Sequence, residues 1–307
     1  MKKIYIDGSA GTTGLRLRTR LEKRSDIELI EIPEQYRKDI DYRKSAMQKA
    51  DAVVLCLPDK AAIEAAEFAP KDTILLDTST AHRTEKNWVY GLPQLCEEQK
   101  NAIKNSKRIA VPGCHACGFV TLVYPLVKAG IIAKNEVLHC FSLTGYSGGG
   151  KSMIADYESE EKSSLLNAPR LYGLSQEHKH LKEMKAITGI NEFPVFAPIV
   201  SDFYSGMQVM IPIEPKKLNT DIETIKNTYK NKYNGQVIKF NENADENGFL
   251  SAAAFSQKDC MQITVEGNND RALLVARYDN LGKGASGAAV ECLNLVLGLD
   301  ETLGLEL

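Results

Sequence analysis

KKIYIDGSAGTTG, residues 2–14, is the stretch of sequence that decides the fold. Residues 3–7 are typical of a short buried strand, and residues 8–14 form a G-x-x-G-x-x-G loop that opens a helix predicted over residues 13–24. Glycines in such a loop let the backbone approach a pyrophosphate, and the helix N-terminus supplies N–H groups and positive potential. The spacing differs from the commoner G-x-G-x-x-G, so a simple strand-to-helix turn is the alternative. Its position ahead of further strand and helix segments favours nucleotide binding.

The segments that follow this loop alternate between strand and helix. Apolar runs predict strands over residues 27–32, 52–57, 73–77 and 108–111, and helical spacing predicts helices over residues 61–68 and 94–105. Strands buried on both faces read as continuous apolar runs, which indicates a parallel sheet. The first part of the chain is therefore predicted to be α/β, a Rossmann-type doubly wound parallel sheet.

Beyond about residue 130 the pattern changes to alternating strands. These are predicted over residues 137–143, 208–213, 262–265 and 273–278, with an amphipathic helix over 220–233 and a final helix over 286–299. This indicates a second α+β domain with a mixed, largely antiparallel sheet. We predict a dinucleotide-binding domain over residues 1–114 plus 284–307, around a substrate domain over residues 115–283.

Composition places the chain among ordinary globular proteins. It has 307 residues, with 38 basic and 40 acidic side chains and a net charge of −2. Such a balance indicates neither nucleic acid nor an anionic membrane as a partner. Seven cysteines, odd in number and scattered through apolar segments, argue against a disulfide framework. We expect a cytoplasmic protein without a membrane segment.

The sequence VPGCH, residues 111–115, places a thiol where a short strand turns into an apolar helix. The helix N-terminus favours thiolate over thiol, which suits Cys114 to act as a nucleophile. A buried apolar cysteine is the alternative. Cys117 completes a C-x-x-C pair, but the pair follows five βα units, which is unlike a thioredoxin, and no partner ligands indicate zinc.

Charged residues after the second predicted strand are candidates for recognition of the cofactor ribose. Glu31 or Glu34 could bind a 2′-hydroxyl, which would indicate NAD, whereas Arg37 and Lys38 could bind the 2′-phosphate of NADP. The residues leave that choice open. A solvated surface run is the third interpretation.

Three further segments carry groups that suit anions or proton transfer. Residues 77–83, DTSTAHR, offer hydroxyls and a guanidinium at the carboxyl end of a predicted strand. Residues 144–151, TGYSGGGK, are glycine-rich; they fit the P-loop spacing only formally and are interpreted as a loop facing substrate or cofactor. His178 and His180 include a candidate general acid and base for a nearby cysteine. No metal site is predicted.

Together these motifs resemble the short-form (type 2) N-acetyl-gamma-glutamyl-phosphate reductase family over nearly the whole chain. The resemblance rests on residues 6–14, 77–83, 90–93 (YGLP), 112–114, 145–151, 178–180 and 279–285 (DNLGKGA). It implies NADP-dependent reductive dephosphorylation of N-acetyl-gamma-glutamyl phosphate to N-acetylglutamate 5-semialdehyde, in arginine biosynthesis, by a homodimer or homotetramer. Alternatives are a related enzyme such as an aspartate-semialdehyde dehydrogenase, or a non-catalytic dinucleotide-binding sensor.

The resemblance also implies roles for individual residues. Cys114 would be the nucleophile and His178 the general acid and base. The residues implied to bind substrate are Arg83, Ser147, Lys151, Tyr172 and His180. The residues implied to bind NADP are Gly8, Ser9, Gly11, Thr12, Thr13, Gly14, Arg37 and Asn280.

One departure lies beside the nucleophile. The family usually reads Asn-Pro-Gly-Cys-Tyr-Pro-Thr, whereas residues 111–117 here read VPGCHAC. The Pro-Gly turn and Cys114 are kept. Val111 removes an amide side chain next to the thiol, and His115 and Cys117 replace the family's Tyr and Thr.

Overall fold

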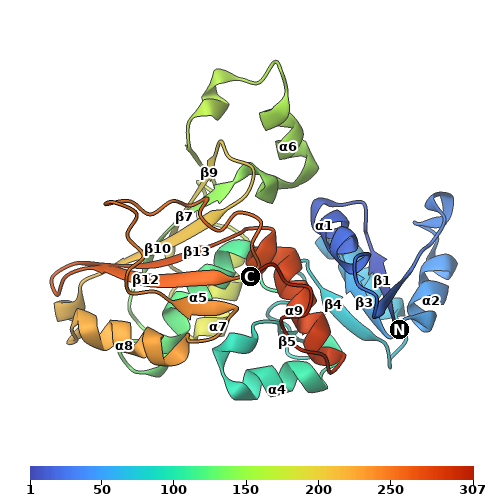
Figure 1. Cartoon of the computed structure of the whole chain (residues 1–307), viewed down its shortest axis with the longest axis horizontal. Coiled ribbons are helices and arrows are strands. Elements are labelled where there is room, and N and C mark those ends of the chain that lie inside the picture. Colours follow the sequence, from blue (N-terminus) through green and yellow to red (C-terminus); the bar gives the residue numbers. More distant parts are fainter. The chain divides into compact units, whose positions relative to one another are not determined.

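The computed structural model describes all 307 residues and divides into two units (Figure 1). Unit 1 comprises Met1–Gly113 and Ala285–Leu305, and unit 2 comprises Cys114–Gly284 and Glu306–Leu307. A π-helical turn, Gly282–Ser286, carries the chain back to unit 1. No helix has both the length and the apolar character that crossing a bilayer requires.

Unit 1 contains a parallel sheet with short connecting helices. Its elements are β1 (Lys2–Asp7), α1 (Thr12–Leu21), β2 (Ile27–Ile30), η1 (Glu34–Tyr36), α2 (Ile40–Lys49), β3 (Ala52–Leu55), α3 (Asp59–Phe68), β4 (Ile74–Asp77), β5 (Val89–Tyr90), η2 (Pro93–Leu95), α4 (Glu97–Asn105), β6 (Arg108–Ala110) and α9 (Gly287–Val296). The strand order is β2-β1-β3-β4-β6-β5, and every pair is parallel. The strand order reverses between β1 and β3, which is where doubly wound sheets bind ligands.

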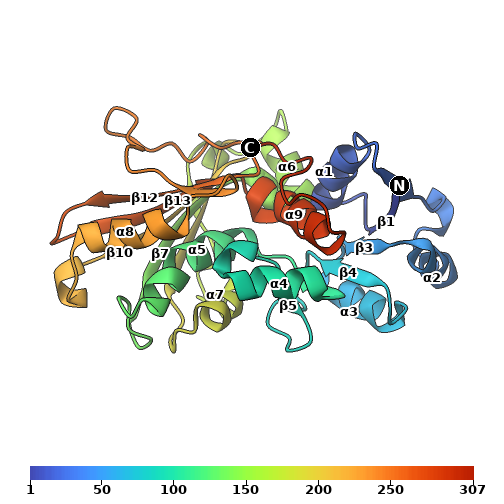
Figure 2. The same cartoon turned by 60° about the horizontal axis from the view of Figure 1, so that its bottom comes forward.

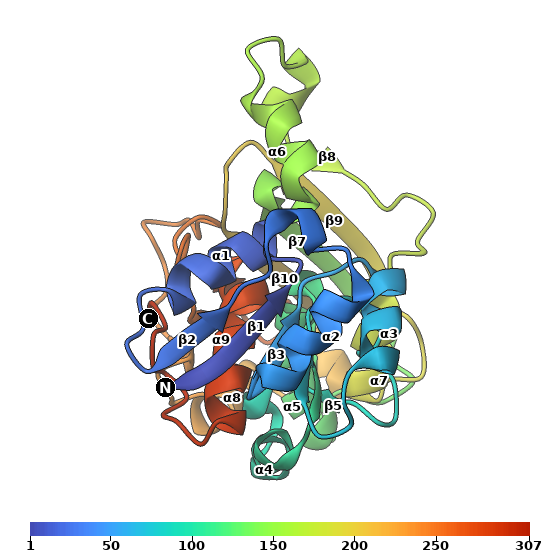
Figure 3. The ribbon, with the colours of Figure 1, turned by 90° about the vertical axis from the view of Figure 1, so that its right-hand side faces the viewer.

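Both faces of this sheet are covered (Figure 3). One apolar cluster joins the strands to α1 and α9, and a second joins the opposite face to α2 and α3. The C-terminal segment therefore completes the first unit's core. The doubly wound parallel sheet expected from the apolar runs is confirmed.

Unit 2 contains a mixed sheet and the remaining helices. Its elements are α5 (Cys114–Lys128), β7 (His139–Gly145), η3 (Tyr146–Gly149), α6 (Gly150–Glu158), η4 (Ser164–Asn167), β8 (Arg170–Leu171), α7 (His180–Thr188), β9 (Val195–Ser201), β10 (Met207–Ile213), η5 (Pro215–Leu218), α8 (Ile222–Lys232), β11 (Ile238–Phe240), β12 (Met261–Gly267) and β13 (Ala272–Tyr278). The strand order is β11-β12-β13-β10-β7-β9-β8. The pairs β7–β9 and β11–β12 are parallel and the others antiparallel, so the predicted mixed sheet is confirmed.

Helices α5, α7 and α8 lie against one face of this sheet (Figure 2). The opposite face leaves apolar side chains exposed along β7, β9 and β13: Phe141, Val195 and Leu273 are each more than two-fifths exposed. Side chains alternate between faces along a strand, so the neighbours Cys140 and Phe196 are buried under the helices. One face of the sheet is thus core and the other is open.

Several predicted elements differ from the observed ones at their ends. The helix predicted over residues 94–105 is split into η2 and α4, because Cys96 is fully extended, with φ −169° and ψ 168°. The sequence prediction omitted α2, whose N-terminus is capped by Asp39. It also omitted β9, which pairs with β7 along its whole length although it contains Pro198.

Candidate functional site

The first turn of α5 is bonded to a tyrosine side chain. The hydroxyl of Tyr278 donates to the carbonyl of Cys114 at 2.6 Å and accepts from the N–H of Gly118 at 3.1 Å. A Cβ on Gly118 would lie 2.6 Å from the hydroxyl, so only glycine leaves room for this contact. Tyr278 therefore fixes the backbone that carries the thiol.

A glycine turn packs against the same cysteine. A Cβ on Gly284 would lie 2.9 Å from the Cβ of Cys114. The N–H of Gly284 donates to the carbonyl of Asp279 at 3.0 Å, and the carboxylate of Asp279 accepts from the N–H groups of Leu281 and Gly282 at 2.8 and 2.6 Å. The turn is rigidly bonded, so the space beside Cys114 depends on the missing side chain at Gly284.

A cluster of imidazole rings surrounds His115, the residue after Cys114. His115 is buried, with Nδ1 2.7 Å from Oγ of Ser142 and Nε2 2.6 Å from the hydroxyl of Tyr172. The rings of His178 and His180 each lie 5.5 Å from the His115 ring, centroid to centroid. The structure therefore brings Tyr172, His178 and His180 together, as a group of candidate site residues in unit 2.

Burial keeps the rings of His115 and His178 neutral. Desolvation, and to a smaller extent the charge of His178, lowers the pKa of His115 to about 3. Desolvation and Lys179 lower the pKa of His178 to about 4. Desolvation raises the pKa of Tyr172, and the charge of Cys114 raises it further. At neutral pH His115, His178 and Tyr172 therefore offer hydrogen-bond donors and acceptors without net charge.

The orientation of His178 is set by the start of α7. The backbone N–H of His180 donates to Nδ1 of His178 at 3.2 Å. In the neutral ring Nε2 then carries the hydrogen, so His178 presents a donor at that atom. His178 is partly exposed, whereas His180 is buried.

The glycine loop of unit 1 has the geometry that a bound pyrophosphate needs. Gly8 has φ +88°, and its Cβ would lie 2.3 Å from the carbonyl of Cys56; a Cβ on Gly14 would lie 2.5 Å from the carbonyl of Gly8. A Cβ on Gly11 would meet nothing closer than 3.6 Å. No side chain caps α1, and the buried Oγ1 of Thr12 has no hydrogen-bond partner. An uncapped N-terminus beside an unsatisfied hydroxyl fits a phosphate oxygen.

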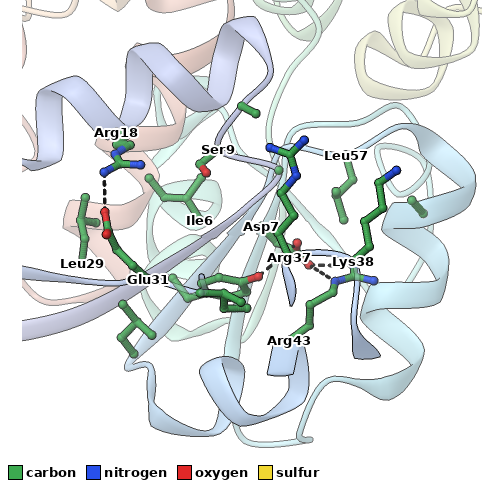
Figure 4. Close-up of a pocket in the computed structure, with 16 residues that line it drawn as sticks. Ile6, Asp7, Ser9, Arg18, Leu29, Glu31, Arg37, Lys38, Arg43 and Leu57 are labelled. Carbon is green, nitrogen blue, oxygen red and sulfur yellow. Dashed lines mark hydrogen bonds and ion pairs between the residues drawn. The ribbon is translucent and has the colours of Figure 1, made fainter. Parts of the chain in front are cut away.

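A cavity of about 430 Å³ adjoins this loop at the carboxyl ends of β1 and β2 (Figure 4). Two acids on its walls are already paired. Glu31 is bonded to Arg18, and Asp7 accepts from Nε and Nη2 of Arg43 at 3.0 and 2.8 Å. Both carboxylates are therefore partly neutralised by these cations.

Two basic side chains line the same cavity. Arg37 is half exposed and forms an ion pair with the exposed Glu34 at 3.2 Å, and Lys38 forms no ion pair in the structure. Figure 4 shows both side chains on the side of the cavity opposite the Arg18–Glu31 pair. The accessible charge on the cavity wall is therefore positive. Ser9 also lines the cavity, and Thr13 lies in the first turn of α1.

Arg83 lies in unit 1, where its guanidinium donates hydrogen bonds to backbone carbonyls. Its Nε donates to the carbonyl of Val111 and its Nη2 to that of Thr78, each at 2.9 Å. The N–H of Val111 donates to the carbonyl of Asp77 at 2.8 Å. Arg83 thus fixes the Val-Pro-Gly turn that precedes Cys114.

The glycine-rich loop after β7 is closed by its own hydrogen bonds. The N–H groups of residues 145, 146 and 147 donate to carbonyls of residues 206, 203 and 204, each at 3.0 Å. These N–H groups are not available to cradle a phosphate, so the formal P-loop spacing has no structural counterpart. Asn280 donates to Ser147 and accepts from the N–H of Gly206, both at 3.0 Å. Asn280 therefore belongs to unit 2, whereas the glycine loop of residues 8–14 belongs to unit 1. Lys151 is exposed on α6.

Sequence reasoning did not identify Ser142 and Tyr278, and it treated His115 only as a departure from the family. Ser142 lies on the inward face of β7, and Tyr278 ends β13. The alternation of those strands places both side chains in the core, but nothing in it indicates that they face α5.

Comparisons with known proteins agree with this arrangement. Residues 3–103 match the family described as "Semialdehyde dehydrogenase, NAD binding domain", and residues 114–280 match "Semialdehyde dehydrogenase, dimerisation domain". Among solved structures, aspartate semialdehyde dehydrogenase II from Vibrio cholerae has a TM-score of 0.72 at 16% identity, covering 97% of this chain and 99% of its own. The enzyme from Candida albicans, solved with NADP, has a TM-score of 0.69 at 16% identity, covering 97% and 98%. These structures share the fold.

Curated relatives are closer in sequence. N-acetyl-gamma-glutamyl-phosphate reductase 2 of Nostoc sp. is 42% identical over 99% of both chains. The N-acetyl-gamma-glutamyl-phosphate reductase of Sinorhizobium medicae is 40% identical over 96% of this chain and 98% of its own. Motifs, fold and relatives therefore agree, and the chain belongs to the N-acetyl-gamma-glutamyl-phosphate reductase family of the semialdehyde dehydrogenases.

Proposed function

We propose that this protein reduces N-acetyl-gamma-glutamyl phosphate to N-acetylglutamate 5-semialdehyde, with NADPH as reductant and release of phosphate. The observation that carries the proposal is the start of α5, where Cys114 opens a helix whose first turn is fixed by Tyr278. Relatives covering nearly the whole chain bear the name of this activity.

Cys114 is proposed as the nucleophile. Its thiolate attacks the acyl carbonyl, a C–S bond forms, and the C–O bond to phosphate breaks with its electron pair leaving on phosphate. The backbone N–H groups at the start of α5 point along the positive end of the helix dipole, which suits the oxyanion that develops on the carbonyl. The product of this half-reaction is a thioester on Cys114.

His178 and Tyr172 are proposed to act on the substrate oxygen. The Nε2–H of neutral His178 donates a hydrogen bond to the oxyanion, and accepting a proton would require rotation away from the N–H of His180. The phenol of Tyr172 stays protonated because burial raises its pKa, so it acts as a second donor. His180 is proposed to contact substrate and to support His178.

NADP is the proposed cofactor, and the residues of the glycine loop are proposed to bind its pyrophosphate: Gly8, Ser9, Gly11, Thr12, Thr13 and Gly14. Arg37 is proposed to bind the 2′-phosphate, with Lys38 on the same wall of the cavity. The pairing of Glu31 with Arg18 supports NADP over NAD, because a carboxylate that binds the 2′-hydroxyl would have to leave its partner. When bound, the reduced nicotinamide supplies the hydride that brings the thioester to the aldehyde level. Asn280 is proposed to contribute to NADP binding through the loop of residues 144–151, which it holds by its bond to Ser147.

Contacts to the anionic parts of the substrate are proposed for Arg83, Ser147 and Lys151. Lys151 is exposed and forms no ion pair, which suits it to an incoming phosphate or carboxylate. Ser147 and Arg83 already hold protein groups, so any contact with substrate is additional to those bonds.

A homodimer or homotetramer is proposed, with a second copy covering the open face of the unit 2 sheet. Apolar side chains exposed on that face would be buried by the partner. The match to a dimerisation domain supports this assembly. We also propose a cytoplasmic location, since none of the seven cysteines forms a disulfide.

The function is tested by substrate comparison in the reverse direction. Purified protein is given phosphate and NADP together with either N-acetylglutamate 5-semialdehyde or aspartate semialdehyde, and NADPH formation is followed. Faster turnover of the N-acetylated compound supports the proposal. Preference for aspartate semialdehyde would assign the neighbouring activity, and cofactor binding without turnover of either compound would indicate a sensor.

A further inference from the structure

The hydroxyl of Ser142 has a single hydrogen-bond partner. It lies on β7 with no exposed surface, and the only bond of its Oγ is the 2.7 Å contact with Nδ1 of His115. His115 in turn has one other polar contact, the 2.6 Å approach of Nε2 to the hydroxyl of Tyr172. The three side chains therefore form an unbranched chain that runs from the core to the partly exposed Tyr172.

Satisfying the buried hydroxyl assigns every hydrogen in this chain. A neutral imidazole has one donor and one acceptor nitrogen. If Nδ1 carried the hydrogen, the O–H of Ser142 would have no acceptor, which costs about 1–3 kcal/mol for a buried group. Ser142 therefore donates to Nδ1 of His115, Nε2 carries the hydrogen, and Nε2–H donates to the oxygen of Tyr172. The phenolic hydrogen of Tyr172 is then left to donate elsewhere.

The surroundings of His115 prevent the ring from reorganising. The rings of His178 and Phe196 meet it edge-on, at centroid distances of 5.5 and 5.3 Å, and His180 packs beside them. Rotation of the imidazole would break both of its hydrogen bonds at once. The orientation is thus set by packing as well as by hydrogen bonding.

We propose that His115 is a positioning residue: with Ser142 it takes up one acceptor site of the Tyr172 oxygen, so that the phenolic hydrogen is directed to the substrate carbonyl oxygen. The predicted effect on kcat rests on the proposed function. The proposal deepens that function because it explains why Tyr172 donates a hydrogen bond to the substrate. It concerns the residue that directly follows Cys114 in the chain.

The first test reads the hydrogen position without turnover. ¹⁵N NMR of histidine-labelled protein, with the His115 signal identified by its loss in His115→Gln, reports which ring nitrogen carries the hydrogen. The expected result is a neutral ring with the hydrogen on Nε2 in the wild type. A hydrogen on Nδ1 would overturn the assignment. Because this readout needs no activity, an Nε2–H ring in a protein without reductase activity would overturn the proposed function alone.

The second test is a double-mutant cycle with Tyr172. His115→Phe and Tyr172→Phe should each lower kcat by about 10- to 100-fold, the value of one directed hydrogen bond. If His115 acts through Tyr172, adding His115→Phe to the Tyr172→Phe protein should have little further effect. The kcat of the double variant should be less than about twofold below that of Tyr172→Phe alone. Losses that multiply would overturn the proposal, because a purely structural effect is indifferent to the phenol.

Two variants guard against misfolding. His115→Gln keeps an N–H that can reach Tyr172 and should recover part of the kcat lost in His115→Phe. Cys140→Ala disturbs the same inward face of β7 without touching the chain of hydrogen bonds and should leave kcat near the wild-type value. Equal losses in His115→Gln, His115→Phe and Cys140→Ala would show that only packing is at stake and would overturn the proposal.

Discussion

The hydroxyl of Tyr278 lies 2.6 Å from the carbonyl oxygen of Cys114 and 3.1 Å from the backbone nitrogen of Gly118. A hydroxyl from the last residue of β13 thus bonds to both a carbonyl and an N–H in the first turn of α5. Tyr278→Phe removes both bonds, so the first turn of α5 and the thiol that it carries should shift.

The expected effect of Tyr278→Phe is a fall in kcat of about tenfold or more, since small displacements of a reacting group are costly. KM for NADPH should stay unchanged, because the proposed nucleotide pocket is lined by residues of unit 1. Steady-state kinetics with both substrates varied gives the two constants. An unchanged kcat would show that the hydrogen bonds of the Tyr278 hydroxyl have no role in placing the thiol.

Gly284→Ala tests the space beside the nucleophile. The new Cβ would lie 2.9 Å from Cβ of Cys114, too close to be accepted without movement. We expect alkylation of Cys114 and turnover to slow together. Gly235→Ala is the matched control, since a Cβ there meets nothing closer than 3.9 Å, and it should behave as the wild type. Equal effects of the two substitutions would contradict this explanation.

His115 makes stability depend on pH. Its pKa is about 3 in the folded protein and 6.5 in an unfolded chain, so between these values the unfolded chain binds a proton that the folded protein does not. The free energy of unfolding therefore falls as pH drops below about 6.5, by about 2–3 kcal/mol at pH 4.5.

Urea unfolding at pH 7 and pH 4.5 measures this loss. His115→Phe should lose less stability between the two pH values than the wild type, although it starts from a lower value. His178, with a pKa of about 4, contributes in the same direction in both proteins. His139→Gln, on the exposed face of β7, should keep the wild-type difference. The same difference in all three proteins would refute the prediction.

Arg37 and Lys38 should determine the choice of cofactor. Replacing both by alanine removes the accessible positive charge of the cavity, so KM for NADPH should rise about tenfold or more while KM for NADH changes little. Glu34→Gln removes the exposed partner of Arg37 and should leave NADPH binding intact or slightly stronger. Equal effects on the two cofactors would contradict recognition of a 2′-phosphate by these residues.

Phe141→Asp tests the proposed oligomer. Phe141 is 43% exposed on the open sheet face, and an unpaired carboxylate buried there by a partner would oppose association. Light scattering coupled to size exclusion should show a smaller assembly than that of the wild type. Phe249→Asp changes a more exposed phenylalanine outside the sheet and should keep the assembly. An unchanged mass in Phe141→Asp would mean that the partner docks elsewhere.

The frame of the fold could be predicted because its signals are local. Ala52–Leu55 is a continuous apolar run, which predicts a strand buried on both faces. The glycine loop directly follows the first predicted strand and precedes a helix, which is typical of a doubly wound parallel sheet. Elements with contrary local signals were omitted: Pro198 argues against a strand over Val195–Ser201, and Val89–Tyr90 is only two residues long. Pairing with β7 stabilises the first of these in spite of its proline.

The candidate site could be predicted only as far as residue types indicate chemistry. Cys114 was proposed from its surroundings in sequence, and His178 was chosen over His180 only by the resemblance to the family. The contacts of His115 with Ser142 and of Cys114 with Tyr278 join residues 27 and 164 positions apart. No local pattern reports such contacts. For Arg83 the chemistry indicated an anion, whereas the guanidinium binds two carbonyls, because both acceptor types satisfy the same donors.

The most direct test of whether Cys114 forms the thioester is to measure the turnover of Cys114→Ser and of Cys117→Ala side by side. With N-acetylglutamate 5-semialdehyde, phosphate and NADP, we expect no NADPH formation by Cys114→Ser. We expect substantial activity of Cys117→Ala, whose buried thiol lies against the carbonyl of Lys283. Turnover by Cys114→Ser at the wild-type rate would contradict a thioester on Cys114.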